Sequence, residues 1–181
     1  MEADKRVLLQ NEEVQRTISR MAHEIVEKNG GAEDIVLVGI HSGGTHLVRR
    51  IGRKIEALTG HAPAVGIVDI TPYRDDIEKR SADAPRIEAP VSVDDRTVVL
   101  VDDVINTGRT IRAALEMLGH LGKPKKILVA TLVDRGDREL PIRADIVGKN
   151  VQVEDSERVN VMLQESDGAD MVIVAKQQQR R

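Results

Sequence analysis

VVLVDDVINTGRT, Val98–Thr110, is the stretch of sequence that decides the fold. Its first four residues are apolar and mostly β-branched, which predicts a strand buried on both faces of a parallel sheet. The run ends in two acids, Asp102 and Asp103, and a short turn then leads into an amphipathic helix over about residues 110–121. A strand, a turn and a helix in this order are typical of an α/β protein.

The end of this strand has the chemistry of a ligand site. Open α/β sheets bind ligands at the carboxyl ends of their strands, where Asp102 and Asp103 stand. The turn stands at a helix N-terminus, whose free N–H groups and dipole favour a phosphate. The turn residues are Asn106, Thr107, Gly108, Arg109 and Thr110. Two acids that merely cap a strand–turn–helix unit are the alternative, and that alternative needs no ligand.

Other apolar runs complete the sheet. We expect strands over residues 35–40, 64–70, 98–103 and 127–133, and helices over 11–29 and 45–58. The helix over 11–29 would be capped by Asn11, and the helix over 45–58 would be basic on its outer face through Arg49, Arg50, Arg53 and Lys54. The prediction is one α/β domain over residues 1–181 with a doubly wound, mostly parallel sheet.

The remaining segments predict a cap and a loop. Residues 1–10 and 135–175 would form a small cap, with an edge strand over 158–163 and an irregular connection over 139–150, where Pro141 disfavours a helix. Residues 71–90 are charged and carry three prolines, which indicates a mobile loop that could act as a lid.

Composition excludes several classes of function. The chain has no Cys, and therefore no disulfide or thiolate chemistry. It has no Phe or Trp, so Tyr73 is the one aromatic residue on which a base could stack. A formal net charge of −3 argues against generic, charge-driven binding of nucleic acid. We see no secretion signal and no apolar run of membrane-spanning length, and expect a cytoplasmic protein without a membrane partner.

Two further strand ends carry candidate site residues. Ser42, Gly43 and Gly44 follow the strand over 35–40, and glycines there let backbone amides approach an anion. A plain glycine turn is the alternative. Polar residues also gather after the strand over 127–133, beginning with Asp134 and Arg135.

The stretch at 98–110 resembles the phosphoribosyl-diphosphate (PRPP) motif of the type I phosphoribosyltransferases. Five more segments narrow the resemblance: SRMAHEIVEKN at 19–29, VGIHSGG at 38–44, DITPYRDD at 69–76, LVDRGDRELPIRAD at 132–145 and GKN at 148–150. Together they resemble the pyrimidine operon attenuation proteins, the bifunctional PyrR family of uracil phosphoribosyltransferases. The resemblance covers nearly the whole chain.

The resemblance implies a reaction in which uracil and PRPP give UMP and diphosphate, with Mg²⁺ as cofactor. Asp102 and Asp103 would hold the ribose hydroxyls and, through PRPP, the Mg²⁺, while Asn106–Thr110 would hold the 5′-phosphate. Ser42, Gly43 and Gly44 would bind the diphosphate, and Arg74 would close over it. Val133, Asp134 and Arg135 would meet the base.

The family also binds leader RNA of the pyrimidine operon in response to UMP or UTP, as a dimer or larger homo-oligomer. The positions matching its RNA-binding face are Ser19, Arg20, His23, Arg138, Arg143 and Lys149. Two other functions stay open: an RNA-binding regulator with little or no catalysis, and a phosphoribosyltransferase for a purine base. A solvent-facing helix residue is the simpler interpretation of His23.

Three positions depart from the family pattern. Asn106 replaces the small residue that many type I members carry, Gly43 stands where some relatives have a basic residue, and Asp137 stands where His is common. Loss of a basic residue at position 43 predicts weaker activity. An acid at position 137 would weaken RNA binding by repelling phosphates.

Overall fold

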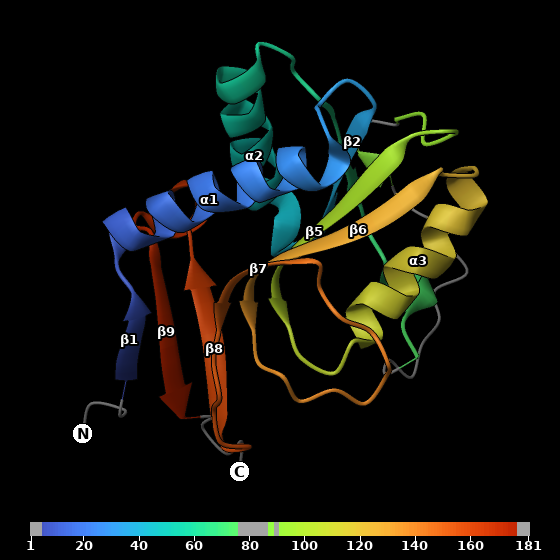
Figure 1. Cartoon of the computed structure of the whole chain (residues 1–181). Helices are drawn as coiled ribbons and strands as arrows, with labels where there is room; N and C mark the ends of the chain where they lie inside the picture. Colours follow the sequence, from blue (N-terminus) through green and yellow to red (C-terminus); the bar gives the residue numbers. More distant parts are fainter. Residues whose placement is uncertain (1–4, 76–86, 89–90, 177–181) are drawn as a thin grey trace.

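The computed structural model describes residues 5–75, 87–88 and 91–176 (Figure 1). The main sheet contains β2 (Ile35–Ile40), β3 (Ala64–Val68), β4 (Ile87–Glu88), β5 (Thr97–Ile105), β6 (Lys126–Asp134) and β7 (Ile146–Asn150). A second sheet contains β1 (Lys5–Leu9), β8 (Glu157–Met162) and β9 (Met171–Lys176). The helices are α1 (Asn11–Asn29), α2 (Gly44–Thr59), α3 (Arg109–Leu121) and α4 (Gln164–Asp167), with a 3-10 turn η1 (Thr71–Tyr73).

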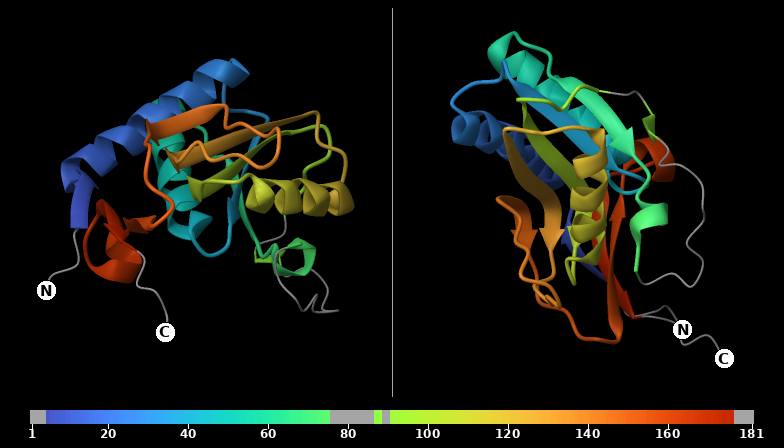
Figure 2. Two further views of the ribbon diagram at one scale, coloured as in Figure 1. Left: turned by 90° about the horizontal axis from the view of Figure 1, so that it is seen from below. Right: turned by 90° about the vertical axis from the view of Figure 1, so that its right-hand side faces the viewer.

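The main sheet is mostly parallel, as predicted. Its strand order is β4-β3-β2-β5-β6-β7, and among the strands of the described residues only the β3–β4 pair is antiparallel. Helices α1 and α2 cover one face and α3 covers the other (Figures 1 and 2). Side chains along β2 point alternately to the two faces of the sheet. Leu37 packs with α1 and α2, whereas Val36 and Val38 pack with α3. The doubly wound α/β architecture is confirmed.

Local sequence explains where α1 begins and ends. The Glu13 carboxylate accepts a hydrogen bond of 2.8 Å from the backbone N–H of Gln10, so that Gln10, rather than the expected Asn11, stands at the N-cap. The helix ends at Gly30, whose φ of 73° lies in the left-handed region that glycine adopts without strain. Val14, Ile18, Met21, Ala22 and Ile25 form the buried stripe.

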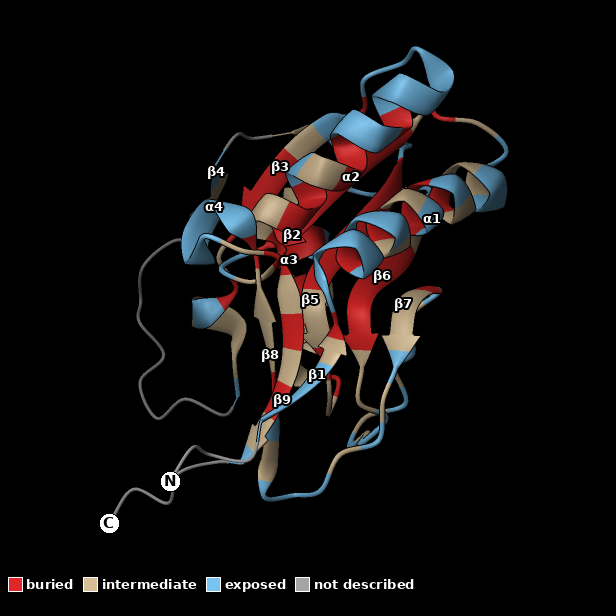
Figure 3. Ribbon diagram, turned by 90° about the vertical axis from the view of Figure 1, so that its left-hand side faces the viewer, coloured by how far each residue is buried: buried red, intermediate tan, exposed pale blue. Residues whose placement is uncertain are grey.

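The second sheet is antiparallel, has the order β1-β9-β8, and is called the hood sheet below. Its strands lie side by side below the carboxyl edge of the main sheet in Figure 1. Val172 and Val174 of β9 are buried, whereas most of β1 is exposed (Figure 3). The edge strand expected over 158–163 is therefore β8, at one edge of this sheet.

Two expectations about the sheet need correction. β5 does not end at Asp103 but runs to Ile105, because Val104 and Ile105 continue the ladder opposite Val133 and Asp134. The segment 139–150 is not irregular throughout, since its end forms β7 beside β6. Gly148 of β7 has no room for a side chain, as a Cβ there would overlap the carbonyl of Leu132 and the side chain of Thr17 on α1.

Part of the expected lid lies outside the described residues. Of the segment 71–90, the structure describes η1 with Arg74 and Asp75, and β4; residues 76–86 and 89–90 are not described. Within the described ranges, no helix is long and apolar enough to cross a membrane.

Candidate active site

The two acids lie inside β5, not beyond it. Asp102 is only 6% exposed, and its Oδ1 accepts a 2.9 Å hydrogen bond from the backbone N–H of Asp103. The Asp103 carboxylate accepts one of 2.7 Å from the N–H of Val104. The backbone N–H of the next residue thus orients each carboxylate. Neither of these two contacts is an ion pair.

The pair is electrostatically costly. Burial raises the pKa of Asp102 well above its ordinary value, and the neighbouring charge of Asp103 raises it further. Burial also raises the pKa of Asp103. The guanidinium of Arg74 acts on Asp102 in the opposite sense and lowers its pKa. Two carboxylates retained in such surroundings are more typical of a functional site than of a cap.

The predicted phosphate loop reaches α3 through Gly108, whose φ is 93°. The N–H groups of the first helical turn that follows have no partner within the helix. The side chain of Arg109 turns away toward two acids, and pairs with Asp75 at 2.9 Å and with Glu139 at 2.7 Å. The backbone N–H of Arg109 donates a hydrogen bond of 3.3 Å to the Oγ1 of Thr107, so neither its guanidinium nor its N–H is without a partner.

The loop after β2 faces the same acids. A pocket of about 360 Å³ is lined by His41, Ser42, Gly43, Thr45, His46, Asp103, Val161, Leu163, Ser166 and Asp167. The Oγ1 of Thr45 is buried and has no hydrogen-bond partner within the described residues. Such an orphaned hydroxyl beside an anion loop is a candidate ligand contact that the sequence analysis missed.

A second pocket, of about 340 Å³, lies between β5 and the hood sheet. It is lined by Asp103, Val104, Asn106, Arg135, Arg158, Val159, Asn160 and Val161. Because Asp103 lines both pockets, the structure brings the predicted ribose, diphosphate and base segments to one place. The sequence analysis did not predict that β8 residues line this pocket, because no local sequence pattern indicates that a hood strand packs near β5.

The three expected base-binding residues differ in their surroundings. Val133 is completely buried in the core and offers only its backbone to a ligand. Arg135 lines the pocket described above and also a neighbouring hollow of about 610 Å³ between the ends of β6 and β7, which Asp134 lines too. The Nε of Arg135 is buried without a hydrogen-bond partner in the described part of the chain.

The six positions expected to contact RNA differ in their surroundings. Arg20 of α1 donates hydrogen bonds to the carbonyls of Val147 and Gly148, and so lies beside the β7 strand that carries Lys149. His23 and Arg143 are exposed, and Ser19 is half-buried. Arg138 instead directs all three guanidinium nitrogens into the chain.

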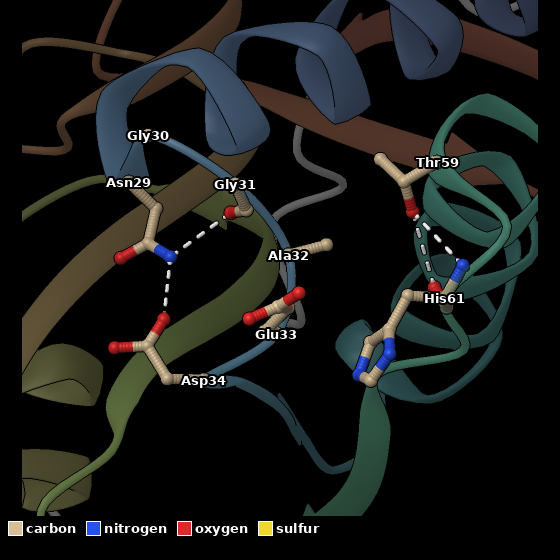
Figure 4. Close-up of a pocket in the computed structure, with 8 residues that line it drawn as sticks. All are labelled: Asn29, Gly30, Gly31, Ala32, Glu33, Asp34, Thr59 and His61. Atoms are coloured by element: carbon tan, nitrogen blue, oxygen red, sulfur yellow. Dashed lines mark hydrogen bonds between the residues drawn. The ribbon is translucent and has the colours of Figure 1, made fainter.

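Another hollow, of about 470 Å³, lies at the opposite, amino edge of the main sheet (Figure 4). Asn29 closes one side of it through hydrogen bonds to Asp34 and to the carbonyl of Gly31, and Thr59 bonds to the backbone of His61 on the other. None of the predicted site residues lines it. The carboxyl edge therefore remains the candidate site.

Gly43→Ala is expected to weaken PRPP binding about tenfold while leaving the fold intact. The φ of Gly43 is −62°, which suits alanine, but the new Cβ would lie closer than 3.0 Å to the Asp103 carboxyl group and displace it. A misplaced catalytic group can cost up to about 100-fold. Calorimetry of PRPP measures the effect. Gly119→Ala on α3, where a Cβ meets nothing within 4 Å, is the matched control. Equal PRPP affinities in the two variants would contradict this placement of Asp103.

Comparison with known proteins defines the class. Residues 6–165 match the family described as the phosphoribosyl transferase domain, and the chain belongs to this family. The fold agrees with it: the hypoxanthine phosphoribosyltransferase of Trypanosoma cruzi superimposes with a TM-score of 0.73 at 17% identity, covering 96% of this chain and 97% of that one. A Staphylococcus aureus hypoxanthine phosphoribosyltransferase gives 0.71 at 22% identity, covering 97% and 92%.

The relatives in sequence are more specific. The chain is 50% identical to the bifunctional protein PyrR of Chloroflexus aurantiacus over 176 residues, 96% of each chain. It is 48% identical to that of Deinococcus radiodurans over 95% of each chain, and 45% identical to that of Bacillus subtilis over 94% of this chain and 96% of that one. The chain belongs to the bifunctional PyrR family of phosphoribosyltransferases.

Proposed function

We propose that the protein transfers the phosphoribosyl group of PRPP to uracil, forming UMP and diphosphate. The observation that carries this proposal is the adjacent pair of buried Asp102 and half-buried Asp103, which stands between the turn into α3 and a pocket of about 340 Å³. The ribose hydroxyls would donate hydrogen bonds to the two carboxylates, and the 5′-phosphate would accept them from the N-terminus of α3.

The proposed step is a substitution at C1′ of the ribose. The bond from C1′ to the diphosphate breaks, a bond from C1′ to N1 of uracil forms, and uracil loses its N1 proton. During the step, positive charge develops at C1′ and negative charge on the leaving diphosphate. Amides of the loop Ser42–Gly44 and the hydroxyl of Thr45 would stabilise the diphosphate, and Arg74 would add positive charge near Asp102. Much of the acceleration would come from holding the two substrates in register.

Mg²⁺ fits this site as a substrate-bound ion. Two adjacent carboxylates are the oxygen donors that Mg²⁺ takes together with substrate phosphates. Within the described residues no group of three or more acidic, His or Cys side chains could hold a metal alone. PRPP would carry the ion, Asp102 and Asp103 would hold it through the bound PRPP, and the ion would neutralise charge developing on the diphosphate.

The test is initial-rate formation of UMP from uracil and PRPP with Mg²⁺, run beside hypoxanthine, guanine and xanthine. We expect turnover with uracil. No turnover together with no PRPP binding would refute the proposal, and turnover of a purine alone would assign the same PRPP site to a purine phosphoribosyltransferase.

We propose in addition that the protein binds pyrimidine-operon leader RNA in response to UMP or UTP, as a homodimer or larger homo-oligomer. The support is its membership of a family named bifunctional and the proximity of Arg20 on α1 to β7, which carries Lys149, with Arg143 exposed just before that strand. Asp137 lines the same hollow as Asn150, the residue after Lys149, and its negative charge would limit affinity for RNA.

Gel shifts with leader RNA, with and without UMP, test this second activity, and sedimentation gives the oligomeric state. Lys149→Gln should weaken binding, whereas Lys126→Gln, an exposed lysine at the opposite end of the neighbouring strand β6, should not. Equal, weak binding of any RNA with or without UMP would leave phosphoribosyl transfer as the single function.

A further inference from the structure

Arg138 differs from Arg20 and Arg143, which are exposed, because its side chain is enclosed by the chain and all three of its guanidinium nitrogens donate hydrogen bonds. Its Nε donates to the carbonyl of Ile142 at 2.6 Å, its Nη1 to the carbonyl of Asn106 at 2.7 Å, and its Nη2 to the carboxylate of Asp134 at 2.6 Å. The side chain is 18% exposed. A guanidinium whose three nitrogens all donate hydrogen bonds within the protein has few N–H groups left to bind a phosphate.

One end of this arrangement holds the phosphate loop. Asn106, whose carbonyl accepts a hydrogen bond from Arg138, is the first residue of that loop and lines the pocket between β5 and β8. The two residues after Arg138 continue the contact, since the N–H groups of Glu139 and Leu140 both donate to the carbonyl of Thr107, at 3.0 and 3.2 Å.

Gly108 of the loop also packs against the segment that contains Arg138. A Cβ at Gly108 would lie 3.5 Å from the side chains of Leu140 and Ile142 and 3.9 Å from Cδ of Arg138, so the loop rests directly on this segment. Loop residues 106–108 are therefore held from outside by a chain segment about thirty residues further along. Their conformation is not set by local sequence alone.

The other end of the arrangement is the base side of the site. Asp134, the last residue of β6, accepts from Arg138 with Oδ2 and from the N–H of Gly136 with Oδ1. It therefore fixes the turn that begins with Arg135, whose side chain lines the pocket beside Asn106. Arg138 is the one side chain among these contacts that touches both the phosphate loop and the residue that ends β6.

We propose that Arg138 is a positioning residue that holds the 5′-phosphate loop and the base-side turn in register, and that it acts in nucleotide binding rather than as a contact to RNA. This inference rests on the proposed function for the identity of the nucleotide. Because the 5′-phosphate is bound equally in the ground state and the transition state, a loosened loop raises KM for PRPP and leaves kcat nearly unchanged.

The test compares Arg138→Gln with Arg138→Lys and with Arg53→Gln, an exposed arginine on the outer face of α2. For Arg138→Gln we expect KM for PRPP and Kd for UMP to rise about 10- to 100-fold, with kcat within about threefold. Arg138→Lys restores only part of this, because an ammonium cannot reach three acceptors arranged around a planar fork. Arg53→Gln stays within twofold in both constants.

A measurement without ligand separates the inference from the proposed function. Hydrogen exchange of the peptide covering residues 106–112 should be faster in Arg138→Gln than in the wild type, and unchanged in Arg53→Gln. Absence of both turnover and PRPP binding in the wild type would refute the proposed function, while this comparison would still decide the role of Arg138. The inference is overturned if Arg138→Gln keeps wild-type exchange and nucleotide constants within twofold but loses RNA binding, or if kcat falls while KM is unchanged.

Discussion

Asp102→Asn is expected to abolish turnover and, near neutral pH, to make the protein more stable. The substitution removes the negative charge that would accept hydrogen bonds from the ribose and hold Mg²⁺ through PRPP. We therefore expect kcat/KM to fall by at least about 100-fold. It keeps the oxygen that accepts the N–H of Asp103, so the local backbone is preserved. Steady-state kinetics with uracil and PRPP measure the loss.

The gain in stability follows from the raised pKa of Asp102. A folded-state pKa above the ordinary value of 3.8 means that the folded protein holds a proton that the unfolded chain releases. Stability is then lost as the pH rises from about the ordinary value through the raised one, and asparagine carries no such cost. We expect Asp102→Asn to be about 1 kcal/mol more stable at neutral pH, with a melting temperature about 3 °C higher, and the difference to vanish near pH 4.

Asp155→Asn is the control, since Asp155 is exposed in the loop before β8. It should change neither turnover nor the pH dependence of melting. If Asp102→Asn retains more than a tenth of the activity, the ribose does not bind where we place it. If it melts below the wild type at every pH, the carboxylate is stabilising and its pKa is not raised.

Arg50→Met is expected to cause the largest loss of stability, about 3–5 kcal/mol in the free energy of unfolding. Arg50 of α2 was expected on an exposed basic face, but its side chain is only 11% exposed. It donates to Glu165 at 2.8 Å and to both oxygens of Asp170 at 2.6 and 2.8 Å. Asp170, which is 3% exposed, also accepts from Gln15 of α1 and from the N–H of Gln164.

This network ties the hood sheet to α1 and α2, and its removal leaves Asp170 buried without its cation. The hydrogen bonds from Arg50 lower the pKa of Asp170, and those to Glu165 do the same there. A lowered pKa contributes stability that is present above the ordinary value and is lost as the pH falls through the lowered one. The difference between the wild type and Arg50→Met should therefore shrink below about pH 4.

Urea unfolding at several pH values measures this effect. Arg49→Met, at an exposed position one residue earlier with no ion pair in the described part of the chain, should stay within about 0.5 kcal/mol of the wild type. A loss below about 1 kcal/mol in Arg50→Met would show that the hood is held by its apolar contacts instead.

Several elements followed from sequence because their cause is local. The apolar runs in β2, β5 and β6 predicted buried parallel strands, and the stripe of α1 predicted its buried face. β7 was missed because it has no such local signal: its sequence IVGKN is short and has neither alternation of apolar and polar residues nor a long apolar run. It is a strand because the open edge of β6 pairs with it.

The sequence by itself determined the α/β class, the pair Asp102–Asp103 toward the carboxyl end of a central strand and the glycine loops, because each depends on neighbours within a few positions. Only the tertiary structure decided which cations are free. Arg50 meets Asp170, 120 residues away, and Arg138 meets Asn106, 32 residues away. Pairings over such distances depend on how helices and strands pack, and no period or local motif encodes that packing. For this reason Arg138, which the sequence assigned to RNA, lies in the structure between the phosphate loop and the base side of the candidate site.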